Sequence, residues 1–147
     1  MSTADQPDLT ETELDALHRA ELGVEWLRRA HGRLVDFHHA TGHAMDHMAA
    51  AEATLREAGH TELADRLRDE VLPNGVVEDR WTYDLLETFE SGILEDVTGY
   101  ERRMREELAD GERHITERRQ EREWKRRASE TDRREVSEPV NGDQREP

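Results

Sequence analysis

Apolar residues recur at helical spacing along the first part of the chain. From residue 14 to residue 55 they follow one another with the 3.6-residue period of an amphipathic helix. This apolar pattern consists of Leu14, Leu17, Val24, Leu27, Leu34, Phe37, Ala44, Met45, Met48 and Leu55. Thr10 and Glu13 have the spacing of a capping box, which marks the start of a helix. The pattern therefore predicts a helix over about 10–58 whose apolar face forms the core.

Glycines and a proline divide the pattern that follows. Gly32 comes after a cationic cluster, as at a helix end, yet no capping residue follows it. One helix bent near residue 32 and two helices meeting there are both open, and we favour the bend. Gly59 is a clearer stop, and a short helix is expected over 61–72. The sequence Pro73-Asn74-Gly75 ends that helix, so the chain reverses over 59–78.

A third apolar pattern predicts a helix over 79–128. Its members are Trp81, Leu85, Leu86, Phe89, Ile93, Val97, Tyr100, Met104 and Leu108. Beyond residue 111 apolar residues become sparse, while arginine and glutamate alternate in pairs that support an exposed helix. No run alternates with a period of two, so no strand is expected. We predict an all-α fold, either an elongated antiparallel helical hairpin or a small helix bundle, with two long arms.

The polar ends bound the folded part of the chain. Residues 1–9 and 129–147 lack periodic apolar positions and hold three of the four prolines, which is typical of disordered tails. Residues 10–128 are expected to form a single helical domain. Only 33% of the 147 residues are hydrophobic and 39% are charged, so the core must be thin.

Composition also excludes several classes of chemistry. The chain has no cysteine, which rules out disulfides, thiolate zinc sites and cysteine nucleophiles. No apolar run approaches the length of a membrane span, and the N-terminus shows no targeting signal. We expect a cytoplasmic protein without a membrane partner.

The net charge is −15, and Lys125 is the only lysine beside twenty arginines. This composition resembles that of cytosolic proteins from salt-in haloarchaea, which hold molar salt. At that salt concentration the Debye length is about 3 Å, so self-repulsion is screened. Affinity for the nucleic-acid backbone also falls steeply with salt. We therefore expect a halophile cytoplasm and no nucleic-acid partner.

Charge is uneven along the chain. Residues 1–100 carry eight arginines against 22 acidic residues, whereas residues 101–135 carry twelve basic and eleven acidic residues. The C-terminal arm is therefore suited to contact an acidic body, either of its own chain or of a second copy. This favours self-association weakly, because molar salt screens the attraction.

The candidate chemistry lies in a histidine ladder. His39, His43 and His47 recur every fourth position, which stacks them along one helix face, opposite the predicted core. Asp36 and Asp46 fall beside them, so two overlapping half-sites result: Asp36, His39 and His43, or His43, Asp46 and His47. Each has three of the four ligands of a structural zinc site. A second copy, or the acids Asp84, Glu87 and Glu90, would have to supply the fourth.

Simpler structural roles compete with the chemical ones. For the ladder we favour a solvated or interhelical polar face over a metal site. His31 and His38 border the predicted apolar core face, where each is expected to make a hydrogen bond at a helix interface. Glu90 has apolar neighbours on its helix, so it is either a buried carboxylate that needs a cation or a rim residue whose head reaches water.

No glycine-rich phosphate loop, nucleophile elbow or catalytic triad is present in the sequence. An enzyme is therefore not favoured. We expect a non-enzymatic interaction or self-association protein without a cofactor, working as a homo-oligomer or with a protein partner. The alternative is a metal-binding helical bundle that holds Zn, Fe or Ni on the histidine ladder.

Overall fold

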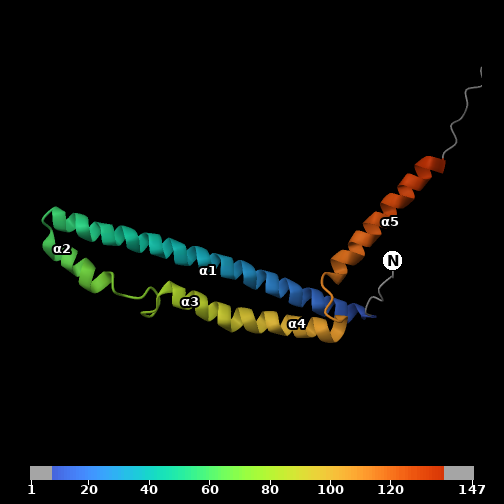
Figure 1. Cartoon of the computed structure of the whole chain (residues 1–147), viewed down its shortest axis with the longest axis horizontal. Helices are drawn as coiled ribbons and strands as arrows, with labels where there is room; N and C mark the ends of the chain where they lie inside the picture. Colours follow the sequence, from blue (N-terminus) through green and yellow to red (C-terminus); the bar gives the residue numbers. More distant parts are fainter. Residues whose placement is uncertain (1–7, 138–147) are drawn as a thin grey trace, which may run out of the picture. The chain divides into compact units, whose positions relative to one another are not determined.

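The chain is all-α over the residues that the structure, a computed structural model, describes (Figure 1). These are residues 8–137, with side chains placed as far as residue 131. They contain no strand, and the only β-type pairing recorded among them is an isolated bridge between Val77 and Arg80. The tails expected over 1–9 and 129–147 fall largely outside the described residues. The predicted all-α class is confirmed.

The first helix, α1, is one continuous helix over Glu11–Glu57. It runs through Gly32, so the possibility of two helices meeting there is wrong. The capping box forms at its start: the backbone N–H and the hydroxyl of Thr10 each donate to Glu13 Oε2 at 2.8 Å, and Glu13 N–H donates back to Thr10 Oγ1 at 3.2 Å. These donors lower the pKa of Glu13. The cap therefore contributes above the ordinary glutamate pKa and is lost as the pH falls through the lowered value.

Gly59 ends α1, as its position in the sequence predicts. Its φ of +91° is the left-handed conformation of a helix C-terminus. The N–H of His60 donates to the carbonyl of Leu55 at 2.9 Å, which satisfies one of the last open carbonyls. A short helix, α2 (Thr61–Arg66), follows and passes into a π-helical turn, η1 (Leu67–Val71).

The remaining helices correct the predicted helix over 79–128. Helix α3 (Thr82–Phe89) leads through a π-helical turn, η2 (Glu90–Leu94), into α4 (Glu95–Ala109). Inside η2, Gly92 has the non-helical angles φ −99° and ψ −109°. The chain then turns over 110–114 before α5 (Ile115–Ser137) begins.

The turn over 110–114 and the length of α5 have local causes. Asp110, Gly111 and His114 have positive φ values, and Gly111 N–H donates to the carbonyl of Arg105 at 3.0 Å, closing α4. Further on, Arg126 pairs with Glu123 at 2.7 Å and with Glu130 at 2.6 Å. Such pairs carry the helix beyond residue 128, into the segment expected to be a tail.

The chain divides into two compact units. Of the described residues, the first unit contains 8–18 and 105–137, and the second contains Arg19–Met104. In the first, the buried apolar residues are Leu14, Leu17, Ala109 and Ile115. Ion pairs at 3.8 Å link His18 to Glu117 and Arg119 to Glu11 in the same unit. In the second, the buried apolar residues are Val24, Ala64 and Leu67.

The loop between η1 and α3 is held by its own backbone. Glu78 and Asp79 both have positive φ, at 49° and 60°, which is the pattern of a type I′ turn between Val77 and Arg80. Val76 N–H donates to the carbonyl of Arg80 at 2.9 Å, and Gly75 N–H donates to Asp79 Oδ1 at 3.0 Å. A Cβ on Gly75 would overlap the backbone of Asp79 and Arg80. Glycine is therefore required at position 75.

We expect Gly75→Ala to destabilise the protein by about 1–3 kcal/mol, the usual cost of forcing atoms into occupied space. The matched control is Gly42→Ala in the middle of α1, where an added Cβ meets no atom within 4 Å. The control should stabilise the protein by about 0.5–1 kcal/mol, because alanine is the better helix former. Urea unfolding followed by circular dichroism measures both changes. Equal effects at the two positions would contradict the close approach at Gly75.

Candidate functional site

Two histidines of α1 bind the segment that lies beside it in the second unit. His31 Nε2 is 2.7 Å from Glu90 Oε1, and the His31 ring stacks on Phe89 with centroids 6.1 Å apart. His38 Nδ1 is 2.7 Å from the hydroxyl of Thr82, which is buried. The predicted role of His31 and His38, a hydrogen bond at a helix interface, is confirmed.

These contacts also set the direction of the two segments. The earlier residue of α1, His31, meets the later residue of the facing segment, Glu90, while His38 meets Thr82. Further along, Arg56 of α1 binds Asp65 of α2 at 3.0 Å. The facing segments therefore run in the direction opposite to α1. Figure 1 draws α3 alongside α1.

Glu90 is the rim residue of the two alternatives that its sequence position allows. Its side chain is 46% exposed, and its carboxylate accepts a hydrogen bond from, or pairs with, the ring of His31. It is therefore not a buried carboxylate that needs a cation.

We expect the His38–Thr82 contact to stabilise the second unit measurably. Thr82→Val keeps the shape of the side chain but removes the hydroxyl, leaving His38 Nδ1 without its partner, and should lower the free energy of unfolding by about 1–3 kcal/mol. Thr41→Val is the control, because the Thr41 hydroxyl bonds only within its own helix, to the carbonyl of Phe37. It should change stability by no more than about 0.5 kcal/mol. Denaturant titration compares the two, and a Thr82 effect no larger than that of Thr41 would count against the contact.

A second face of α1 carries large apolar side chains that its own chain leaves exposed. Trp26 is 59% exposed, Phe37 41% and Met48 40%. They are spaced eleven residues apart, and eleven residues make about three helical turns, so the three share one face. Leu22, also exposed, lies one turn before Trp26. We call Leu22, Trp26, Phe37 and Met48 the apolar stripe of α1.

The apolar stripe corrects the predicted core. Phe37, Ala44 and Met48 were expected to be buried and are exposed, whereas Leu27, Leu34, Met45 and Leu55 are half-buried as part of the covered face. The sequence signal for the difference was the regular spacing of Trp26, Phe37 and Met48. A helical period alone merges two adjacent faces into one, because it tolerates a wide arc. Which part of this arc of α1 is buried depends on where the facing segment packs against it.

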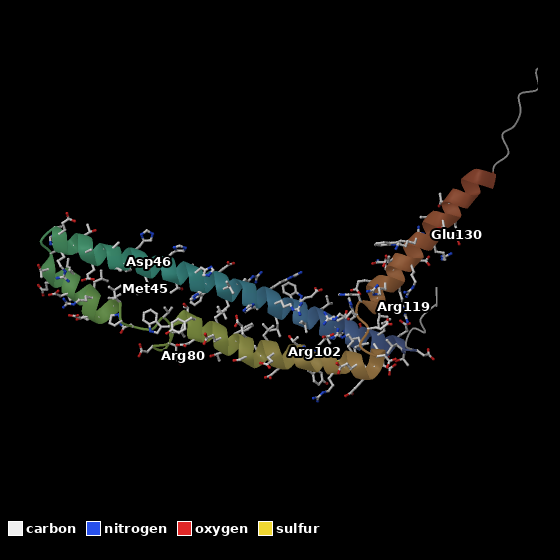
Figure 2. All side chains as sticks on the ribbon, viewed as in Figure 1. Met45, Asp46, Arg80, Arg102, Arg119 and Glu130 are labelled. Atoms are coloured by element: carbon white, nitrogen blue, oxygen red, sulfur yellow. The ribbon has the colours of Figure 1, made fainter. Side chains whose placement is uncertain are left out.

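The histidine ladder lies on the exposed surface of α1. All five of its residues, Asp36, His39, His43, Asp46 and His47, are exposed. Figure 2 labels Asp46 beside Met45, its half-buried neighbour in the chain. In the described part of the chain the ladder does not bring three ligand atoms within 4.8 Å of one another, and Asp84, Glu87 and Glu90 do not join it in such a set. The single chain therefore does not close a four-ligand site there.

An open depression of about 730 Å³ lies in the second unit around the start of α4. Its charged lining is mixed: Arg28, Arg102 and Arg103 face it together with Glu90, Glu95 and Asp96. Binding pockets are typically concave and largely apolar with a few convergent polar groups. This depression is open and mainly charged, so it does not indicate a ligand class.

The chain was compared with models of protein families, with curated proteins and with solved structures, and none of the three comparisons found a match. Among the described residues, no helix is both long enough and apolar enough to cross a membrane.

Proposed function

We propose that this protein is a non-enzymatic helical protein that acts by pairing with a second copy of itself through the apolar stripe of α1. The single observation that carries the proposal is the exposure of Trp26, Phe37 and Met48 along one helix face. Apolar side chains aligned on one exposed helix face can pack against a partner helix. Aromatic residues and methionine are also enriched in protein interfaces. In this proposal the second unit is an elongated antiparallel helical hairpin, with α1 as its outer, pairing arm.

The spacing of the stripe supports an antiparallel pair. Trp26 and Met48 lie eleven residues before and after Phe37. A twofold axis at Phe37 therefore sets Phe37 against its own copy. It also sets Trp26 of each copy against Met48 of the other. A symmetric dimer requires such a self-complementary surface. The small residues Ala30 and Ala44 are placed symmetrically too, which lets the helices approach closely between the large side chains.

Charge favours the same orientation. Residues 19–33 of α1 contain four arginines and two glutamates, whereas residues 41–55 contain two acids and neither arginine nor lysine. An antiparallel pair sets these two stretches against each other. A parallel pair would bring Arg29 and Arg33 beside their own copies, and like charges in contact are unfavourable. Arg29 already lies 4.6 Å over the Trp26 ring, so a cation belongs to this end of the stripe.

The proposed setting is a halophile cytoplasm. Molar salt screens ion pairs within a few ångströms, but it does not weaken the burial of apolar surface, and some salts strengthen it. An interface centred on Trp26, Phe37 and Met48 therefore suits an acidic chain in salt. No catalysis, cofactor or nucleic-acid partner is part of the proposal.

We expect the full chain to sediment as a dimer in molar KCl and the variant Trp26→Glu with Met48→Glu to sediment as a monomer. Each exchange places a charge in the interface that apolar groups of the second copy would have to bury. Tyr100→Glu is the control, since Tyr100 is 64% exposed but lies outside the stripe, and it should leave the dimer intact. Circular dichroism confirms that the variants stay helical. A wild-type monomer, or a dimer that survives both exchanges in α1, overturns the proposal.

Cysteine cross-linking tests the orientation separately, because the natural chain has no cysteine. Phe37→Cys should form a disulfide-linked dimer on mild oxidation. Trp26→Cys and Met48→Cys should each cross-link poorly alone and well when the two variants are mixed. Efficient cross-linking of Trp26→Cys with itself would show a parallel pair instead.

A further inference from the structure

We propose that His43 and His47, assisted by Asp46, bind a divalent transition-metal ion such as Zn²⁺ or Ni²⁺ on the exposed surface of α1. The inference is independent of self-association, since all three residues belong to one helix. The three side chains are exposed, and none of them enters a hydrogen bond or an ion pair within the described part of the chain. They are available to a ligand from solvent.

Helix geometry brings the two imidazoles within reach of one ion. Residues four apart on a helix have Cβ atoms about 5–6 Å apart. Zinc binds histidine nitrogen at about 2.0–2.1 Å, so rotation of two exposed side chains brings both nitrogens onto one ion. The same spacing places two zinc ligands on the helix of the His-Glu-x-x-His proteases. This helix supplies the backbone frame, because α1 is unbroken through both residues.

His43 and His47 form a better pair than His39 and His43. Asp46 lies one turn from His43 and within the span of the pair, so its carboxylate is close to the ion. Asp36, the acid of the other half-site, is seven residues from His43, which is about 10.5 Å along the helix axis. The His39 ring also contacts that of His38 at 5.5 Å, and His38 is held by Thr82.

The local charge favours a cation. Residues 34–55 contain no arginine or lysine, although the chain has 21 of them. Some acids of the chain have basic partners, as Glu52 has Arg56 at 2.9 Å, whereas Asp46, like several other exposed acids, has none in the described structure. Imidazole selects transition metals over Mg²⁺ and Ca²⁺, which prefer sites made wholly of oxygen.

The test is titration of the untagged full chain with Zn²⁺ and Ni²⁺ by isothermal calorimetry, with Mg²⁺ as the negative ion. We expect saturable binding of both transition metals and none of Mg²⁺. His43→Ala and His47→Ala should each weaken binding at least tenfold, and Asp46→Asn should weaken it less. His60→Ala is the control, because His60 is exposed and has no histidine one turn away; it should leave the affinity unchanged. Alanine favours the helix, so these variants in α1 keep their fold.

Repeating the titration with the variant Trp26→Glu with Met48→Glu separates this inference from the proposed function. Binding that persists in a monomeric variant supports a site within one helix. Absence of binding in the wild type, or binding unaffected by His43→Ala and His47→Ala, overturns the site whether or not the chain dimerises. Retention of binding in His47→Ala with loss in His39→Ala would move the ion to the other half-site and equally contradict the assignment.

Discussion

Two hydrogen bonds across a thin interface govern how α1 meets the segment beside it. No large side chain among the described residues is fully buried, so the apolar core of the second unit specifies position weakly. His31 with Glu90 and His38 with Thr82 supply the missing specificity, since a hydrogen bond of 2.7 Å tolerates little displacement. A shift of α1 by one residue would rotate both histidines away from their partners. The register of the pair, and hence the choice of exposed face on α1, depends on these two contacts.

Local rules predicted much of the fold. The capping box of Thr10 and Glu13, the stop at Gly59 and the all-α class all follow from interactions within a few residues, which a sequence displays directly. The boundary histidines were also predictable, because a titratable residue at the edge of an apolar stripe needs a polar partner. The identity of those partners was not predictable, since Glu90 and Thr82 are distant in sequence from His31 and His38.

The interruptions were harder to predict, for two physical reasons. Residues 110–114 turn through positive φ values at Asp110 and His114 as well as at Gly111, and non-glycine residues in that conformation carry no clear sequence signature. The π-helical turn η2 lies within a continuous apolar pattern. A search for the 3.6-residue period therefore does not detect it. Burial posed a different difficulty, because Phe37 and Met48 have the spacing of core residues but no covering segment. The candidate ligands of the ladder were recognised from spacing alone, because residues four apart lie on one helix face.

Helix α1 presents three different surfaces along its length. One face binds the facing segment through His31 and His38, an adjacent face holds the apolar stripe, and a third displays His43 and His47. Successive residues on a helix are rotated by about 100°, so each of three faces receives about one residue per turn. Along the apolar stripe Trp26, Phe37 and Met48 follow one another about every three turns, whereas His43 and His47 are about one turn apart. A short helix would offer each face a single contact, whereas 47 residues provide several along one rigid rod. The low hydrophobic content of the chain is thus compatible with specific association, because its apolar residues are placed in line rather than gathered in a core.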